Sequence, residues 1–417
     1  MHKIERLLHT LAPKGVEFKT LEEVFEIKNG YTPSKKNPEF WKNGTIPWFR
    51  MEDLRENGRI LKDSIQHITP KALKGKKLFP KNSIIISTTA TIGEHALLIV
   101  DSLANQRFTF LSKKANCDLA LDMKFFFYQC FLLGEWCKNN TNVSGFASVD
   151  MTAFKKYKFP IPPLEIQQEI VTILDAFTEL NTELNTELNA RKKQYQYYQN
   201  MLLDFNDINQ NHKDAKMSAK TYPKRLKTLL HTLAPNGVEF RKLGEVCDFQ
   251  KGKSITKKAV TFGKVPVISG GRQPAYYHNE ANRSGETIAI SSSGVYAGYV
   301  SYWDIPVFLA DSFSVSPKQK TLMPKYLFHY LTTQQDAIHA TKSAGGIPHV
   351  YSKDLQNFLI PIPPLEIQQE IVKILDQFSA LTTDLLAGIP AEINARKKQY
   401  EYYREKLLAF KPLQNKE

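Results

Sequence analysis

The chain has 417 residues, more than one ordinary domain holds, and this length indicates two or three domains. Its apolar fraction of 42% and charged fraction of 24% are those of a folded protein and exclude a disordered chain. The formal charge of +14 favours a polyanionic partner such as nucleic acid, although a solvated basic surface has the same signature.

The beginning of the chain carries no recognisable targeting signal. No apolar signal-peptide core follows Met1, and the longest apolar stretch, residues 125–133, is far shorter than the ~20 residues that span a bilayer. The cysteines at positions 117, 130, 137 and 247 lack the spacing of metal ligands. We therefore expect a soluble cytoplasmic protein with free thiols and no metal site.

The sequence contains an internal repeat, with two copies of one pattern. Three segments recur in the same order: 7–13 as 229–235, 160–171 as 361–372, and 189–195 as 394–400. The offset between the copies shrinks by about 17 residues between Tyr31 and Ile84, so that Phe108 aligns with Phe313. Such a repeat indicates duplicated structural modules. The segments that differ most between the copies, 31–83 and 253–287, suggest one task performed on two different targets.

Each copy begins with a mixed module. The runs 83–87 and 287–291 predict buried strands, and shorter runs at 108–111, 265–268 and 298–300 predict further strands. One helix is expected over 124–128 and its counterpart over 325–329. A proline-rich stop then ends each module, at 160–163 and 361–364, because proline suits the start of a helix but not its interior.

A long amphipathic helix is predicted after each proline stop. Apolar positions recur at helical spacing from Ile170 to Leu202, which predicts a helix from Leu164 to about Asp204, ~60 Å long. Its apolar stripe needs a partner, and Ile371 to Leu407 supply a matching one. We expect an antiparallel coiled coil between the copies, with one module at each end and a pseudo-two-fold axis.

The two helical spacers differ in length and in amino-acid sequence. The first repeats Thr-Glu-Leu-Asn three times over 178–189, and each unit adds about one helical turn, ~6 Å. The second contains Pro390, which should kink or break its helix. The predicted fold class is α+β, with target-recognition domains at 1–160 and 213–360, a central helical spacer at 161–212 and a C-terminal spacer at 361–417.

Sequence signatures of catalysis are missing. Gly252-Lys253-Ser254 imitates the end of a phosphate-binding loop, but the glycine required upstream is absent. The Asn/Asp-Pro-Pro-aromatic loop of an amino-methyltransferase does not occur, and the ten histidines form no H-E-x-x-H cluster. No catalytic residue is therefore assigned.

The duplicated Pro-Pro-Leu-Glu-Ile-Gln-Gln-Glu-Ile-Val block and the tandem Thr-Glu-Leu-Asn units resemble the specificity (S) subunit of a type I restriction-modification system. The resemblance covers nearly the whole chain and includes residues 29–33 and 87–93. The second module departs from the pattern, because no Thr-Pro follows Gly252 and Ser291–Gly294 replaces the threonine-rich turn.

The resemblance implies a division of labour within a complex. Each target-recognition domain would read one half of a bipartite, asymmetric site in double-stranded DNA, and the helices would set the gap and bind two methyltransferase (M) subunits. Motor-nuclease (R) subunits would join for restriction. S-adenosylmethionine, ATP and Mg would belong to these partners, and this chain would hold no cofactor.

Candidate DNA contacts follow from chemistry. Basic residues of the variable segments are expected to contact phosphates: Lys35, Lys36, Arg50, Lys71, Lys74, Lys76, Lys77, Lys251, Lys253, Lys257, Lys258, Arg272 and Arg283. Side chains offering paired donors and acceptors are expected to read base edges: Tyr31, Thr32, Ser34, Thr88, Thr89, Arg107, Gln273, Tyr276, Tyr277, His278, Ser292, Ser293 and Tyr296. Lys342 and His349 are secondary candidates. The alternative for the basic residues is an ordinary charged surface, and the alternative for the base-reading candidates is a structural role in turns or in the core.

Two other functions remain open at this stage. An independent DNA-binding regulator would use the same two modules without partners. A methyltransferase or nuclease with a degenerate motif would bind the methyl donor or cleave DNA by itself.

Overall fold

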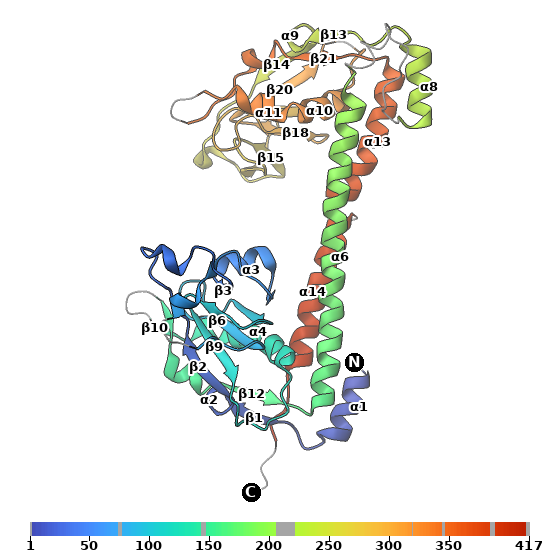
Figure 1. Cartoon of the computed structure of the whole chain (residues 1–417). Helices are drawn as coiled ribbons and strands as arrows, with labels where there is room; N and C mark the ends of the chain where they lie inside the picture. The colour runs from blue at the N-terminus through green and yellow to red at the C-terminus, as the bar shows by residue number, and fades with distance from the viewer. Residues whose placement is uncertain are drawn as a thin grey trace. The chain divides into compact units, whose positions relative to one another are not determined.

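The computed structural model describes residues 2–73, 77–142, 147–205, 222–318, 320–343, 347–383 and 388–413. The chain forms two compact units (Figure 1). Unit 1 contains residues 1–183 and 394–417, and unit 2 contains residues 184–393. The predicted domain boundary at residues 212 and 213 lies outside the described residues.

The main sheet of unit 1 is buried on both faces. Its strand order is β2-β9-β6-β7-β4, with β6 (Ser83–Ser87) at the centre. Side chains alternate along a strand, so Ile84 and Ile86 pack with helix α4 (Met123–Asn139), whereas Ile85 joins the opposite cluster around Phe110. The other strands are β2 (Phe25–Asn29), β4 (Ile60–Leu61), β7 (His95–Leu98) and β9 (Phe108–Lys113).

Smaller elements complete unit 1. Strand β1 (Glu17–Thr20) pairs with β12 (Lys158–Ile161) at the start of the long helix. A three-stranded sheet has the order β5-β3-β8. The remaining elements are α1 (His2–Leu11), α2 (Leu21–Val24), η1 (Pro38–Phe40), β3 (Ile46–Phe49), α3 (Met51–Asn57), β5 (His67–Ile68), η2 (Pro70–Leu73), β8 (Leu103–Ala104), β10 (Thr141–Asn142), β11 (Ser148–Val149) and α5 (Met151–Lys155).

Unit 2 repeats this architecture. Its main sheet has the order β14-β20-β17-β18, and Ile288 and Ile290 of β17 (Thr287–Ser291) share a core cluster with helix α10 (Pro324–Thr333). A second sheet has the order β16-β15-β19. The remaining elements are α8 (Lys224–Leu233), β13 (Phe240–Lys242), α9 (Leu243–Val246), β14 (Cys247–Lys251), η3 (Lys257–Ala259), β15 (Val265–Ile268), β16 (Tyr276–His278), β18 (Val300–Trp303), β19 (Phe308–Leu309), β20 (Ser312–Pro317), α11 (Gln335–Ala340), α12 (Ser352–Leu355) and β21 (Leu359–Pro361).

The strand registers align the two copies residue by residue. Ser87 faces Phe108 in unit 1, and Ser291 faces Ser312 in unit 2. Phe108 therefore corresponds to Ser312, which corrects the predicted alignment with Phe313 by one residue. About half of the extra length of the first copy forms α3 and β4, and β4 is the fifth strand of the main sheet of unit 1.

Helix α6 (Leu164–Leu203) has the predicted bounds and contributes to both units. In unit 1 its first half lies beside α14 (Ile389–Leu408), with Phe177 stacked on Tyr403 at 5.5 Å between ring centroids (Figure 1). In unit 2 its second half lies beside α13 (Leu365–Thr383), with Tyr198 stacked on Phe378 at 5.1 Å. The predicted pairing of helices from the two copies is thus present within each unit.

The helical spacer of the second copy is divided, as its proline predicts. Helix α13 ends at Thr383, and α14 begins at Ile389 with Pro390 in its first turn. Proline is tolerated there because the first turn has no intrahelical partner for its missing N–H. Residues 384–387 are outside the described part.

The same hydrogen bonds from a buried glutamine, which we call the polar lock, join each module to its long helix. The Gln167 side-chain amide donates to the carbonyls of Pro162 and Ala120 at 2.7 and 2.9 Å, and Gln368 makes the same bonds to Pro363 and Thr321 at 2.7 and 2.8 Å. Both glutamines are fully buried. An ion pair accompanies each lock, Lys124–Asp175 at 2.5 Å and Lys325–Asp376 at 2.6 Å, and Asp376 also bonds His329 at 3.0 Å. These contacts explain why the proline-headed block is nearly identical in both copies.

Candidate DNA interface

Three loops of unit 2 meet beyond the end of β17. The amide of Ser292 donates to the carbonyl of Asp311 at 3.0 Å, and the amide of Val350 donates to the carbonyl of Ser292 at 2.9 Å. The amide of Gly294 donates to the carbonyl of Pro348 at 3.1 Å. Backbone bonds therefore connect all three loops.

Polar and aromatic side chains gather on these loops. The guanidinium of Arg272 lies 5.0 Å from the ring centroid of Tyr296 and 5.6 Å from that of Tyr299. A cation over aromatic rings is held in place while its donors still face solvent. The hydroxyl of Ser293 donates to Asp311, and Lys342 Nζ donates to the carbonyl of Val295 at 3.5 Å.

Unit 1 builds the same loop junction from the same backbone bonds. The amide of Thr88 donates to the carbonyl of Arg107 at 3.1 Å, and the amide of Val149 donates to the carbonyl of Thr88 at 2.9 Å. The isolated bridge between Thr89 and Ser148 matches the one between Ser293 and His349. The same backbone bond closes the loop after the central strand in both units: the Gly93 amide donates to the Ser87 carbonyl at 2.9 Å, and the Gly298 amide to the Ser291 carbonyl at 2.8 Å. The φ angles of these glycines are 89° and 86°.

The side chains on this shared backbone differ in chemistry. Arg107 of unit 1 stands where unit 2 has Asp311, a reversal of charge. Ser148 stands where unit 2 has His349, which stacks on Tyr351 at 5.9 Å. Two surfaces with one backbone and different donors and acceptors can recognise different patterns of base edges.

The other candidates of unit 1 lie on nearby segments. Tyr31 is held by its backbone, since its amide donates to the carbonyl of Ala104 at 2.8 Å and its carbonyl accepts from Trp48 Nε1 at 2.9 Å. The Thr32 hydroxyl donates to Gln106, a polar side chain that the sequence analysis missed although it precedes Arg107. Ser34, Lys35, Lys36, Lys71 and Lys77 are exposed, Lys71 beside Glu39 at 3.5 Å, and Arg50 is half-buried over the Trp48 ring at 5.9 Å. Lys74 and Lys76 lie outside the described residues.

In unit 2 the remaining candidates flank the loop junction. Lys251, Lys253, Lys257 and Lys258 are exposed on and after β14, and Gln273 is exposed next to Arg272. The rings of Tyr276 and Tyr277 are exposed on β16. The exposed Tyr351, with Lys353 Nζ at 5.5 Å from its ring, was missed because it lies close to the scaffold segment of the sequence.

Three candidates have structural partners inside their domains. The Thr88 hydroxyl is buried against that of Thr109 at 3.0 Å, and His278 is buried with its Nδ1 at 3.1 Å from the Thr261 backbone. The Arg283 guanidinium bonds Ser314 Oγ at 2.9 Å and the carbonyls of Asn282, Gln250 and Lys251 at 2.8 to 3.1 Å. Burial lowers the pKa of Arg283 from its ordinary value. We leave these three side chains out of the candidate interface.

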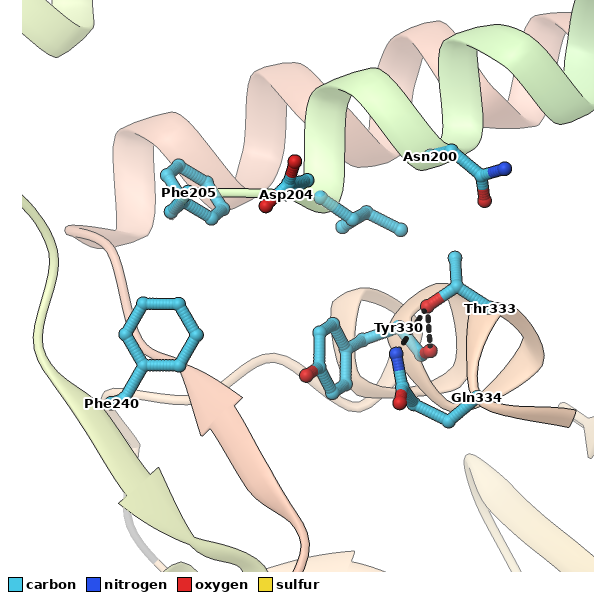
Figure 2. Close-up of a pocket in the computed structure, with 8 residues that line it drawn as sticks. Asn200, Asp204, Phe205, Phe240, Tyr330, Thr333 and Gln334 are labelled. Carbon is cyan, nitrogen blue, oxygen red and sulfur yellow. Dashed lines mark hydrogen bonds between the residues drawn. The ribbon is translucent and has the colours of Figure 1, made fainter. Parts of the chain in front are cut away.

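Unit 2 also has a cavity of about 260 Å³ away from these loops (Figure 2). Its eight lining residues include Asn200, Phe240 and Tyr330. Burial raises the pKa of the Tyr330 hydroxyl to about 12. Thr333 bonds Tyr330 and Gln334 across its wall at 2.7 and 3.1 Å. Within the described ranges, no three His, Cys, Asp or Glu side chains are grouped to hold a metal ion, and no helix is long and apolar enough to cross a membrane.

The chain was compared with protein families, with curated relatives and with solved structures. A family model described as the type I restriction modification DNA specificity domain matches residues 13–194 and 235–395. The chain is 41% identical over 385 residues to the type I restriction enzyme EcoprrI specificity subunit of Escherichia coli, covering 89% of each chain. It is 32% identical over 306 residues to the EcoR124I/EcoR124II specificity subunit of Escherichia coli, covering 65% of this chain and 69% of that relative. It shares its fold with the crystal structure of the S subunit from M. genitalium, at a TM-score of 0.58 and 18% identity over 94% of this chain and 96% of that one.

Proposed function

The chain belongs to the type I restriction-modification DNA specificity family, and from this premise we propose that each unit reads one half of a bipartite, asymmetric DNA site. Sequence-specific DNA recognition in a restriction-modification system is the function of this family. The finer proposal rests on one observation, the duplicated loop junction that carries different side chains in the two units.

The proposed base-reading groups lie on this junction or on a loop that contacts it. In unit 2 they are Arg272, Gln273 and Tyr296, and in unit 1 they are Thr89, Gln106 and Arg107. An arginine fork matches the two acceptors of guanine in the major groove, and an amide matches adenine. The exposed lysines beside each junction would contact phosphates and set the orientation of the unit on the duplex.

The paired helices would set the gap between the half-sites and bind two methyltransferase (M) subunits. Motor-nuclease (R) subunits would complete the restriction complex. We assign no catalysis to this chain, so S-adenosylmethionine, ATP and Mg would be bound by the partner subunits. The complex would act on double-stranded DNA in the cytoplasm.

Sequencing of methylated sites in cells that carry this chain with its partner subunits tests the proposal. We expect one motif with two defined halves and a fixed gap. Arg272→Ala should relax one half only and Arg107→Ala the other, each costing about 1–3 kcal/mol of discrimination at one base pair. Arg241→Ala is the matched control, because Arg241 forms ion pairs with Glu239 and Glu245 at 3.7 Å away from the loops.

Several outcomes would contradict the proposal. A continuous motif, or a variant that alters both halves, would exclude one half-site per unit. Binding of the site by the isolated chain, with no methyltransferase co-purifying, would favour an independent regulator. Methyl-donor binding or DNA cleavage by the isolated chain would favour an enzyme.

A further inference from the structure

Two apolar side chains project from the loop junction of unit 2. Val295 is 82% exposed and Ile347 is 65% exposed. The antiparallel bridge between Ser293 and His349, followed by the bond from the Gly294 amide to Pro348, sets the register of these two segments. Val295 follows Gly294 and Ile347 precedes Pro348, so the two exposed residues lie on neighbouring loops on either side of this bond. We call Val295 and Ile347 the apolar tip.

Cations lie on the apolar tip or beside its chain neighbours. Lys342 Nζ donates to the carbonyl of Val295 itself, and Arg272 is held over Tyr296, the next residue along the chain. Lys353 lies over Tyr351, which stacks on His349. An apolar protein groove would leave these charges without counterions, whereas a polyanion would neutralise them. Charge complementarity thus identifies DNA as the partner of this tip.

Unit 1 has a polar residue at the position of Val295 although it has the same loop. Between the closing residues, residues 88–92 form the loop of unit 1 and residues 292–297 form the loop of unit 2, which is one residue longer. The exposed residue at the position of Val295 is Thr91 in unit 1. An apolar residue at the position of Val295 is therefore not needed to build the junction.

We propose that Val295 of the apolar tip contacts the C5 methyl group of a thymine in the half-site that unit 2 reads. This inference rests on the proposed function and names the base chemistry at one position. The thymine methyl is the one apolar group that a base pair presents in the major groove. Valine is short and stiff at χ1, so it offers a fixed methyl surface but does not reach far enough to wedge between stacked bases, a task of larger side chains.

Thymine-to-uracil replacement tests the proposal, because it removes only the methyl group. The full chain, in complex with its partner subunits, is titrated with duplexes that carry the methylated motif with uracil at one thymine at a time. We expect one thymine in the unit 2 half-site at which uracil weakens binding about five- to tenfold. Val295→Ala should weaken binding to the thymine duplex by a similar factor and should show no further loss with uracil.

Ile305→Ala serves as the matched control, because Ile305 is exposed in the same unit but outside the three loops. It should keep the full sensitivity to uracil. Equal binding of uracil and thymine duplexes, a unit 2 half-site without thymine, or undiminished sensitivity in Val295→Ala would each overturn the proposal. Failure of the chain to specify any two-part motif would instead refute the proposed function, so the two failures are distinguishable.

Discussion

Deletion of residues 182–185 removes one Thr-Glu-Leu-Asn unit from α6 and should shorten the gap between the half-sites. The deletion keeps the apolar stripe, because Leu188 moves into the position of Leu184, and both leucines are half-buried. Four residues contribute ~6 Å of rise and a net turn of ~40° to an α-helix. One base pair contributes ~3.4 Å and ~34° to B-DNA. The rise and the rotation that the deletion removes each correspond to about one to two base pairs.

Sequencing of methylated sites measures the gap directly. We expect both half-sites to be unchanged and the gap to be shorter, whereas insertion of a further unit should lengthen it. The substitution Glu183→Ala is the control, since Glu183 is exposed within the same repeat and its replacement alters no length. Altered half-sites with an unchanged gap would refute the reasoning that the helix sets the spacing.

Three further predictions concern stability and DNA binding. Gln167→Leu should lower the free energy of unfolding by about 1–3 kcal/mol in a denaturant titration, because the buried carbonyl of Pro162 loses its donor, whereas exposed Gln168→Leu should have little effect. Burial raises the pKa of Asp376, but hydrogen bonds from its histidine and lysine partners outweigh this and lower it from 3.8. This contribution to stability is therefore present above pH 3.8 and is lost as the pH falls through the lowered pKa, so Asp376→Asn should flatten the acid limb of a pH titration of stability. Lys253→Ala should weaken binding to all DNA sequences alike and reduce the slope of log K against log salt by about 1, and a change in sequence preference would contradict its phosphate role.

Local pattern and repetition predicted most of the fold. The run of isoleucines at 83–87 predicted strand β6, and the apolar spacing from Ile170 predicted the bounds of α6 and its need for a partner helix. The repeated Pro-Pro-Leu-Glu-Ile-Gln-Gln block predicted a shared scaffold, but the function of its glutamines was not evident. Gln167 locks onto Ala120, which is 47 residues away, and no local pattern reports such a contact.

The candidate interface was harder to predict, because exposure depends on tertiary partners. Arg283 has the sequence character of a DNA-binding arginine, yet Ser314 and the carbonyls of β14 satisfy its donors. His278 packs edge-on against Phe308, 30 residues later in the chain, at 5.4 Å between rings. Conversely, Val295 is an apolar residue outside the variable segment 253–287, and no pattern in the sequence marks it as exposed. Val295 is 82% exposed beside the bond between Gly294 and Pro348, a contact between distant parts of the chain that the sequence does not reveal.

The loop junction offers a physical reason why one fold can acquire new specificity. The bonds from Thr88 to Arg107 and from Ser292 to Asp311 run between backbone groups, so they form whichever side chain the accepting residue carries. Reversal of charge at this position, from arginine to aspartate, leaves the bond length at 3.1 and 3.0 Å. A change there alters the pattern of donors and acceptors offered to DNA without a cost in packing. Arg107→Asp should therefore change one half-site while the thermal unfolding temperature stays within a few degrees of the parent chain, and a large loss of stability would show that this side chain supports the fold.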